Sequence, residues 1–304
     1  MVAAVRVHKH GGPEVLTYED VDIPAPGQGQ IKIKQHAAGI NFIDCYFRMG
    51  MYPSPVGMPF IAGNESAGEV SAVGPGVTDF KIGDRVAYVG PLGGYAAERV
   101  VPADRAVKLP DNISYEQAAG MMLKGMTVQY LVNRTYKVGK GTVCLIHAAA
   151  GGVGLIACQW ANHLGATVIG TVGSKDKAEI ARKNGAHHVI LYRDEDFVAK
   201  VKEITSGKLC DVVYDGVGKA FDLTQFHQQL IGHGSIAVRF LRFLERVFLV
   251  DRDFHRAGTD LFEQILGGGD EIIALGDVVV ERRPRRKERA LGLQDIDVES
   301  VDLA

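Results

Sequence analysis

The residues with the clearest potential for chemistry form a glycine-rich segment in the middle of the chain, 142–154, with the sequence TVCLIHAAAGGVG. An apolar run ends at Ile146, and small residues then lead to Gly151, Gly152 and Gly154, after which a second apolar run begins. This order predicts a buried parallel strand, a tight turn and a helix whose first turn is bare backbone. Such a turn suits a pyrophosphate, because its N–H groups approach closely and the helix dipole favours negative charge.

The motif within this segment is A-x-x-G-x-x-G, formed by Ala148, Gly151 and Gly154, with Val153 in the expected first helical turn. It is a relaxed dinucleotide fingerprint, weak by itself but supported by the strand before it and the helix after it. The alternatives are a close-packed glycine turn without a ligand, and a membrane span. Three glycines, a histidine and a glutamine within 142–161 favour a buried core over a membrane span.

The residues after the next predicted strand indicate which dinucleotide binds. In dinucleotide folds an acidic residue about 20 positions after the glycine turn binds the ribose 2′-hydroxyl. Here Thr171 occupies that position, and Gly173, Ser174 and Lys177 follow. Ser174 and Lys177 can donate hydrogen bonds to a 2′-phosphate, which a carboxylate would repel, and Tyr192 could add a hydroxyl. The pattern favours NADPH over NADH; the alternative is an ordinary helix start with Ser174 as its N-cap.

Length and composition indicate an ordinary globular protein. The chain has 304 residues, enough for one large or two ordinary domains, with 46% hydrophobic and 23% charged residues. A net charge of −2 carries no signature of nucleic-acid or membrane binding. Four widely spaced cysteines, without a C-x-x-C pair or a signal peptide, predict reduced thiols in a cytoplasmic protein. Cys144 and Cys158 lie in apolar runs, which predicts inert core positions.

The first hundred residues lack a βαβ rhythm and predict a compact, barrel-like, β-rich unit. Its predicted strands are 3–8, 30–37, 69–73 and 85–89.

From Ser114 the pattern changes, because Ser114 and Gln117 form a capping box at the start of a helix that Gly125 is expected to interrupt. The alternation of strands and helices that follows predicts a doubly wound parallel sheet. The predicted elements are helix 116–133, strand 142–146, helix 153–164, strand 167–172, helix 175–184, strand 187–191, helix 195–205, strand 210–214 and strand 235–238.

The last part of the chain has a different composition. Residues 239–250 are basic and apolar, 260–266 could form a short helix, 282–289 are a basic charge run and 295–302 are acidic. This composition favours a poorly ordered tail, with a nucleic-acid-binding arm as the alternative.

Seven short motifs together carry a resemblance to a known family. They are HGGPEVL at 10–16, GINFID at 39–44, GMYP at 50–53, GNESAG at 63–68, GDRV at 83–86, LKGMT at 123–127 and the glycine motif at 148–154. With these motifs, the chain from about residue 5 to about residue 237 resembles the zinc-independent quinone oxidoreductases (zeta-crystallin type) of the medium-chain dehydrogenase/reductase superfamily.

The resemblance implies an α/β fold, with a Rossmann doubly wound parallel sheet and an N-terminal β-rich GroES-like domain. The implied domains are 1–113 for the GroES-like catalytic domain, 114–238 for the Rossmann NADPH-binding domain, and 239–304 for a divergent segment that returns to the catalytic domain in relatives. It implies an enzyme, an NADPH:quinone oxidoreductase, that transfers hydride in the interdomain cleft without metal. A homodimer is also implied, although its sheet edge comes from the region after Ala237, where the resemblance stops.

The resemblance also implies roles for individual residues. Asn41 and Thr127 would face the nicotinamide, and Tyr46 and Tyr52 would line the substrate side, with half-buried packing as the alternative for the two tyrosines. The implied cofactor-binding residues are Ala148, Gly151, Gly152, Val153, Gly154, Gly173, Ser174, Lys177, Tyr192 and Gly216.

A metal site is not expected. Zinc relatives carry Gly-His-Glu where this chain has Gly63-Asn64-Glu65, and an asparagine is a poor zinc ligand. Cys45 is four positions from the place of the first cysteine ligand, and the four-cysteine structural lobe is missing.

Three functions remain open at this stage. The first is NADPH-dependent reduction of quinones or related conjugated carbonyls, the second is a 2-alkenal or enoyl reductase on the same fold, and the third is an NADPH-binding sensor or RNA-binding protein with little turnover. The expected partner is a small molecule rather than a membrane or a nucleic acid.

Overall fold

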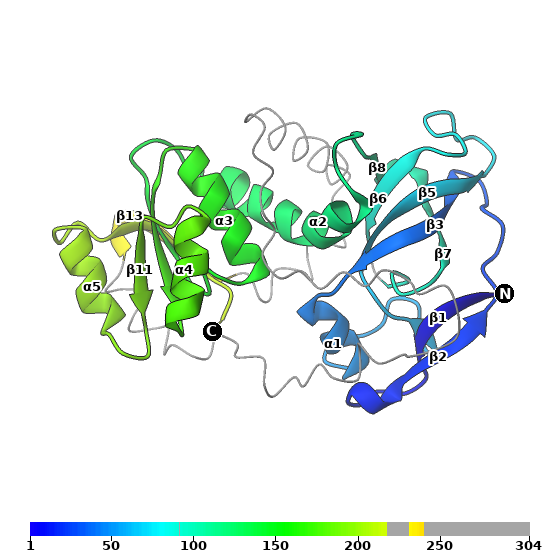
Figure 1. Cartoon of the computed structure of the whole chain (residues 1–304), viewed down its shortest axis with the longest axis horizontal. Helices are drawn as coiled ribbons and strands as arrows, with labels where there is room; N and C mark the ends of the chain where they lie inside the picture. Colours follow the sequence, from blue (N-terminus) through cyan, green and yellow to red (C-terminus); the bar gives the residue numbers. More distant parts are fainter. Residues whose placement is uncertain (91, 218–230, 240–304) are drawn as a thin grey trace. The chain divides into compact units, whose positions relative to one another are not determined.

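The computed structural model describes residues 1–90, 92–217 and 231–239, the last of these by their backbone alone. By its internal contacts the chain divides into two compact units, one from Met1 to Leu123 and one that begins at Lys124. The first is β-rich and the second alternates strands and helices, as the sequence predicts (Figure 1). No helix within the described ranges is long and apolar enough to cross a membrane.

The first unit contains a three-stranded sheet of order β2-β1-β4 and a five-stranded antiparallel sheet of order β7-β3-β5-β6-β8. The elements are β1 (Val2–Val7), a 3₁₀ turn (Pro13–Val15), β2 (Leu16–Val21), β3 (Gln30–Gly39), α1 (Phe42–Arg48), β4 (Phe60–Ile61), β5 (Glu65–Val73), β6 (Arg85–Val89), β7 (Glu98–Pro102), a second 3₁₀ turn (Ala103–Arg105) and β8 (Ala106–Lys108). Alternate residues of the five-stranded sheet point inward and form a core cluster that includes Ile31, Ile33, Val70, Val86 and Val101, whereas Ala4 and Val21 of the three-stranded sheet belong to a separate cluster.

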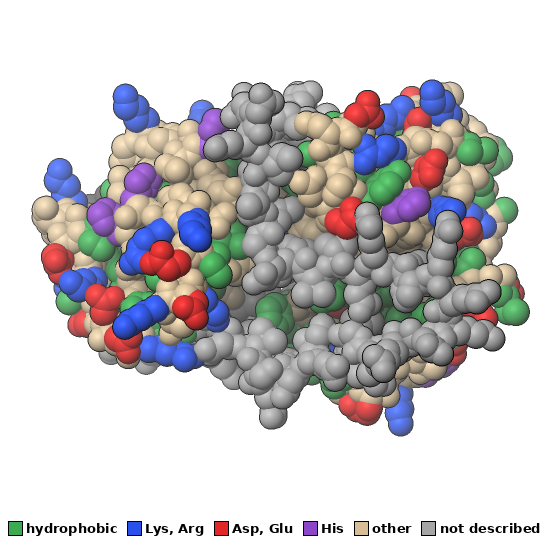
Figure 2. Space-filling model, in the orientation of Figure 1, with side chains coloured by type: hydrophobic (Ala, Val, Ile, Leu, Met, Phe, Trp, Pro, Cys, Tyr) green, Lys and Arg blue, Asp and Glu red, His purple; other side chains and the backbone are tan. Residues whose placement is uncertain are grey.

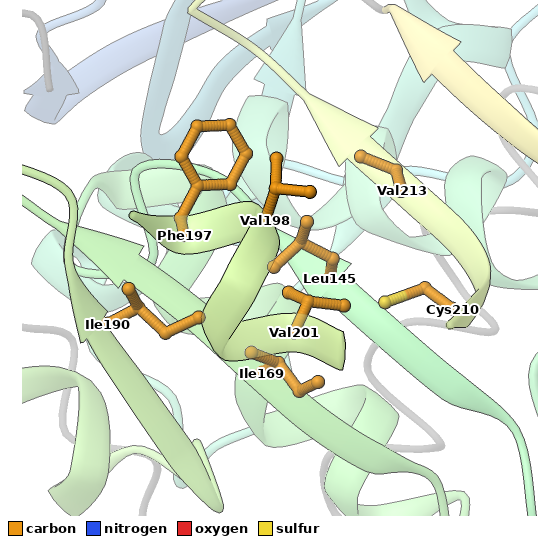
Figure 3. Close-up of a cluster of buried hydrophobic side chains, with 8 residues drawn as sticks. All are labelled: Leu145, Ile169, Ile190, Phe197, Val198, Val201, Cys210 and Val213. Atoms are coloured by element: carbon orange, nitrogen blue, oxygen red, sulfur yellow. The ribbon is translucent and has the colours of Figure 1, made fainter. Parts of the chain in front are cut away.

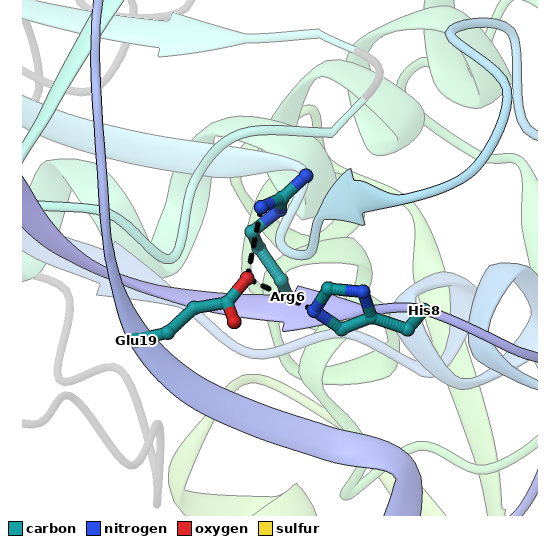
Figure 4. A network of polar contacts seen from close by, with 3 residues as sticks. All are labelled: Arg6, His8 and Glu19. Carbon is teal, nitrogen blue, oxygen red and sulfur yellow. Dashed lines mark hydrogen bonds and ion pairs between the residues drawn. The ribbon is translucent and has the colours of Figure 1, made fainter.

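The β1–β2 hairpin is antiparallel, with Ala4 opposite Glu19. The Glu19 carboxylate accepts hydrogen bonds from Arg6 and His8 at 2.9 Å each, so it joins the two strands (Figure 4). These side chains are partly exposed, and such pairs contribute little to stability.

Helix α2 (Tyr115–Tyr130) crosses the division between the two units and begins at the predicted capping box. The backbone N–H of Ser114 donates to Gln117 Oε1 at 2.9 Å, and the N–H of Gln117 donates to Ser114 Oγ at 3.1 Å. The predicted interruption at Gly125 is wrong, because Gly125 is buried inside a continuous helix that ends in a π-helical turn (Leu131–Thr135). A helical glycine costs only about 1 kcal/mol, which the burial of neighbouring side chains outweighs.

The second unit is a five-stranded parallel sheet of order β11-β10-β9-β12-β13. Its elements are β9 (Val143–Ile146), α3 (Gly152–His163), β10 (Thr167–Val172), α4 (Lys175–Lys183), β11 (His188–Leu191), α5 (Phe197–Ile204), β12 (Cys210–Asp215) and β13 (Ile231–Arg239). This is the doubly wound order that the alternation predicts.

One core cluster of the second unit shows how α5 is fixed to the sheet (Figure 3). Phe197, Val198 and Val201 of α5 pack against Leu145 and Ile169 of the central strands, and the cluster also includes Ile190, Cys210 and Val213. Helices α3 and α4 pack along β10. Charged side chains of both signs, with some hydrophobic ones between them, are interspersed over the visible surface of this unit (Figure 2).

The sequence located the strands and helices of the second unit and missed several of the first. Strands β6 and β10 have the predicted bounds, and the remaining elements of the second unit end within a few residues of theirs. Strands β2, β4, β7 and β8 and helix α1 were not predicted. Strand β4 has only two residues, and the burial of β2 does not alternate along the strand, so neither shows the period of a half-buried strand. The short helix predicted at 260–266 and the charge run at 282–289 lie outside the described residues.

Candidate functional site

The glycine-rich turn between β9 and α3 has the geometry of a phosphate cradle. Gly151 is the N-cap of α3. Because glycine has no side chain, the cap residue offers no side-chain acceptor to the N–H groups of the first helical turn. A Cβ atom on Gly154 would meet the Ala148 carbonyl oxygen and would lie 2.8 Å from Ala149 Cα, which is closer than real Cβ atoms come. Backbone therefore packs where a side chain would stand, and the bare helix start fits a pyrophosphate.

The turn is pinned to both neighbours of β9. The N–H of His147 donates to the Tyr214 carbonyl of β12 at 3.0 Å, and the N–H of Ala149 donates to the Thr171 carbonyl of β10 at 3.1 Å. Between them Ala148 has a φ of +52°, a conformation that L residues rarely adopt and that costs on the order of 1 kcal/mol. Strand β9 lies between β10 and β12, so the turn sits at the topological switch point, where open α/β sheets bind ligands.

Thr171 does not take part in the way that its sequence position suggests. Its side chain is fully buried, and its hydroxyl lies 2.8 Å from His147 Nδ1. The hydroxyl therefore points into the protein. The lack of a carboxylate at this position does not by itself distinguish NADPH from NADH, and the choice depends on the residues that follow Thr171.

Those following residues come together beside the ends of two strands. Ser174 is the N-cap of α4, and its Oγ accepts a hydrogen bond from the N–H of Lys177 at 3.4 Å. Tyr192, after β11, donates its N–H to the Val172 carbonyl at the end of β10. Gly173 stands between this carbonyl and the helix cap, so the backbone brings Gly173, Ser174 and Lys177 close to Tyr192. The Tyr192 side chain packs against the core cluster that fixes α5 to the sheet.

Gly216 follows the end of β12, on the same edge of the sheet as the glycine turn. The residues on either side of Gly216 are linked, because the buried Asp215 side chain accepts a hydrogen bond through Oδ1 from the N–H of Val217 at 2.9 Å. Gly216 is therefore held in a short Asx-type turn at the carboxyl edge, where a nucleotide of this fold binds.

The first unit carries a second set of polar residues, centred on Asn41, the N-cap of α1. Asn41 and Asp44 form a capping box, in which Asp44 Oδ2 accepts the N–H of Asn41 at 2.9 Å. The side-chain amide of Asn41 donates to Glu65 Oε1 at 2.8 Å, and Glu65 Oε2 accepts the N–H of Leu123 at 2.7 Å. Glu65 is 0% exposed and Asp44 is 7% exposed, so two carboxylates are buried around one half-buried asparagine.

Two more side chains hold Asp44. Asn64 donates its amide to Asp44 Oδ1, and the Tyr95 hydroxyl donates to Asp44 Oδ2 at 2.6 Å. Burial raises the pKa of Asp44 to about 6, although the hydrogen bonds from Tyr95 and Asn64 act in the opposite direction. Burial and the neighbouring Asp44 also hold the pKa of Tyr95 well above its usual value.

Tyr46 and Tyr52 lie together at the end of α1. Their ring centroids are 5.5 Å apart, and the N–H of Tyr52 donates to the Tyr46 carbonyl at 3.2 Å. Both are half-buried, and burial raises the pKa of Tyr46. Thr127, which the resemblance pairs with Asn41, is half-buried on the part of α2 that belongs to the second unit.

Sequence reasoning missed Asp44, Glu65 and Tyr95 as site residues. Asp44 and Glu65 lie inside motifs quoted for the family resemblance, but nothing in a motif shows that a carboxylate is buried. Tyr95 carries no sequence signal, because its link to Asp44 spans 51 positions.

Asn64 stands where zinc relatives carry a histidine ligand, and its side chain makes a different interaction. Asn64 is fully buried and donates to Asp44, so its amide is committed to that carboxylate. Within the part of the chain that the structure describes, no three His, Cys, Asp or Glu side chains are grouped as metal ligands. All four cysteines are free, and burial raises the pKa of Cys144 and Cys158 to about 12, as core thiols require.

Comparison with known proteins agrees with this geometry. Residues 27–111 match the model of the alcohol dehydrogenase GroES-like domain, and residues 152–239 match that of the zinc-binding dehydrogenases. A quinone oxidoreductase of Pseudomonas aeruginosa is 52% identical over 220 residues, which cover 72% of this chain and 67% of that protein. A 2-haloacrylate reductase of a Burkholderia species is 51% identical over 224 residues, with the same two shares.

Solved structures of quinone oxidoreductases are also similar to this chain. The crystal structure of Escherichia coli quinone oxidoreductase complexed with NADPH is 43% identical, with a TM-score of 0.77 over 88% of each chain.

Proposed function

Because the chain belongs to the zinc-independent quinone oxidoreductase group of the medium-chain dehydrogenase/reductase superfamily, we propose that it reduces quinones with NADPH, by hydride transfer and without a metal. The observation that carries the proposal is the turn between β9 and α3, where Gly154 leaves room only for backbone at the switch point of the sheet.

The residues of the second unit hold the cofactor. The N–H groups at Gly151–Gly154 bind the pyrophosphate, while Ser174, Lys177 and Tyr192 bind the 2′-phosphate of the adenosine. Lys177 adds positive charge that favours the 2′-phosphate of NADPH, a group that NADH lacks. The NADPH in the solved relative from Escherichia coli supports this choice of cofactor.

The residues of the first unit act on the reacting end. Asn41, together with Thr127, positions the nicotinamide, and Tyr46 and Tyr52 form the apolar side against which the acceptor ring lies. When bound, NADPH supplies a hydride, and a quinone that takes up this hydride and one proton becomes a hydroquinone. A quinone is a good electron sink, so the protein's contribution is orientation and exclusion of water rather than Lewis-acid activation.

A second candidate is reduction of a carbon–carbon double bond conjugated to a carbonyl or carboxylate. The similarity to a 2-haloacrylate reductase favours it, because the identity is 51% for this protein and 52% for the quinone oxidoreductase of Pseudomonas aeruginosa. Both reactions use the same hydride and the same fold, and they differ in the atom that accepts the hydride.

The experiment that separates the candidates is a steady-state acceptor panel. NADPH oxidation is followed by fluorescence with 1,2-naphthoquinone, 2-chloroacrylate and a 2-alkenal, and the products are identified by chromatography. We expect kcat/KM to be highest for the quinone, with hydroquinone as product. Efficient turnover of 2-chloroacrylate alone would replace the first candidate by the second, and NADPH binding without turnover of any acceptor would refute both.

We further propose that the protein works in the cytoplasm as a homodimer. Its four free cysteines, three of them buried, suit a reducing compartment. Light scattering of the purified full chain tests the dimer, and fractionation of cells tests the compartment.

A further inference from the structure

Two buried carboxylates hold one residue of the first unit from two directions. Asp44 binds the backbone N–H of Asn41 at 2.9 Å, and Glu65 binds its side-chain amide at 2.8 Å. Together they fix both the backbone and the side chain of Asn41. A buried carboxylate costs folding free energy unless its oxygens accept hydrogen bonds, so an arrangement with two of them points to a role beyond packing.

The rest of the network anchors the two carboxylates to separate parts of the unit. Asn64 and Tyr95 donate to Asp44, and the N–H of Leu123 in α2 donates to Glu65. Gly39 and Gly63 make these approaches possible: a Cβ on Gly39 would meet Glu65 Oε1, and one on Gly63 would meet the Tyr95 ring.

We propose that Asp44 and Glu65 are positioning residues for hydride transfer, which hold the Asn41 amide in its working orientation without touching cofactor or acceptor. This inference rests on the proposed function, in which Asn41 positions the nicotinamide. Asn41 is half-buried whereas both carboxylates are buried, so Asn41 is the one of these three residues that can meet a ligand.

The ionised form of Asp44 is the form that holds Asn41. The partners of its two oxygens, Asn41 N–H, the Asn64 amide and the Tyr95 hydroxyl, are all donors. A protonated carboxyl would turn its own O–H toward one of these donors and lose that hydrogen bond. Protonation of Asp44 therefore loosens Asn41.

The pH at which this happens depends on the groups around Asp44. Burial raises the pKa of Asp44 to about 6, the hydroxyl of Tyr95 lowers it, and the charge of Glu65 raises it. The other ionisable groups nearby are Cys45, whose own pKa is raised by burial, and Arg48, both on α1. We expect kcat to fall as the pH drops through about 6.

The first test replaces Glu65 by glutamine, which keeps its size. Glu65→Gln leaves one acceptor oxygen for two donors, so either Leu123 or Asn41 loses its hydrogen bond. We expect kcat with 1,2-naphthoquinone to fall about ten- to a hundred-fold, since an error near 1 Å in reacting geometry has that effect. The dissociation constant for NADPH should change less than three-fold. Glu69→Gln on the same strand, at a partly exposed position beside His36, is the matched control and should turn over normally.

The second test separates a structural role from positioning. In the double variant Asn41→Asp/Glu65→Gln, the glutamine amide donates to the new aspartate and restores the bond with its direction reversed. The melting temperature of the cofactor-free protein should recover relative to Glu65→Gln, whereas kcat should not, because the amide at position 41 is gone.

The third test uses Tyr95→Phe. Loss of the hydroxyl removes a hydrogen bond that lowers the pKa of Asp44, so the acid limb of kcat should move to higher pH. A carboxyl ¹³C titration of Asp44 in the cofactor-free protein should move in the same direction.

The outcomes are distinct for the two proposals. If the unmodified protein reduces no quinone and no conjugated alkene, the proposed function fails. If it is active while Glu65→Gln keeps full kcat, or Tyr95→Phe leaves both the acid limb and the ¹³C titration in place, the positioning role is wrong. Recovery of kcat in the double variant would also overturn it.

Discussion

Replacement of Gly154 by alanine tests the cofactor cradle most directly. In an ordinary helix this change stabilises a protein by about 1 kcal/mol. Here the new Cβ would meet the Ala148 carbonyl oxygen and lie 2.8 Å from Ala149 Cα, whereas ordinary contacts begin at 3.4 Å. The turn or the helix must therefore retreat by about 0.6 Å at Ala149, and by more at the Ala148 carbonyl.

The magnitude follows from what that retreat disturbs. Overpacking of this kind costs about 1–3 kcal/mol. The Ala148 carbonyl also accepts the N–H of Gly151 at 2.8 Å, and its loss costs about 1 kcal/mol more. After subtraction of the helix gain, we expect Gly154→Ala to destabilise by about 2 kcal/mol, which lowers Tm by about 4–8 °C. The first N–H groups of α3 move with the turn, so NADPH binding should weaken by about ten-fold or more.

Two other glycines supply matched controls. A Cβ on Gly139 meets nothing within 4 Å, so Gly139→Ala should leave both Tm and NADPH affinity unchanged. A Cβ on Gly152 would lie 2.8 Å from Cδ and Cε of Lys124, the far end of a flexible side chain that can move aside. Gly152→Ala should therefore destabilise less than Gly154→Ala. The assays are thermal unfolding and NADPH fluorescence titration; a Gly154→Ala protein that melts at or above the unmodified protein and binds NADPH equally well would refute the geometry.

The remaining predictions concern cofactor choice, backbone strain, metal and pH. NADPH should bind more tightly than NADH by about 1–3 kcal/mol, and Lys177→Ala should remove much of this difference in a titration with both cofactors; equal affinities in the unmodified protein contradict it. Ala148→Gly should leave Tm unchanged or raise it, because φ is +52°, and a clear drop in Tm argues against strain there. Elemental analysis should find no stoichiometric zinc, and chelator should leave quinone turnover intact; one tightly bound zinc per chain overturns this. Since the pKa of Asp44 is raised from 3.8 to about 6 in the folded protein, its contribution to stability is complete below pH 4 and is lost as the pH rises through about 6, by at most about 3 kcal/mol. Urea unfolding at pH 4.5 and 7 should show this slope, and Asp44→Asn should flatten it.

The sequence predicted the structure well wherever all the residues that determine a feature lie in one short stretch. The segment from Val143 to Gly154 carries its strand, turn and helix in order, and the structure has each of them in place. The capping box of Ser114 and Gln117 is also local, and both of its hydrogen bonds are present. Ser174 is likewise an N-cap because a hydroxyl stands before an amphipathic run.

Features that join distant residues could not be predicted in this way. The bond between Tyr95 and Asp44 depends on how the strands of the first unit are ordered, and no periodicity encodes that order. The Thr171 hydroxyl meets His147, which directly follows the neighbouring strand β9, and a count of positions from the glycine turn does not show this contact. Gly125 failed as a helix breaker because the packing around α2 outweighs its intrinsic cost.

The Asn41 network shows that stability and function require opposite charge states of the same group. Below pH 6 the protonated Asp44 avoids the cost of a buried charge, so the fold is more stable, but the carboxyl then no longer serves all of its donors. Above pH 6 the ionised Asp44 lowers stability and holds Asn41. Between pH 4.5 and neutral pH, the Asp44→Asn variant should therefore lose less stability than the unmodified protein loses. It should nevertheless turn over more slowly. Retention of a buried acid that weakens the fold at working pH is understandable if the orientation of Asn41 is what it maintains.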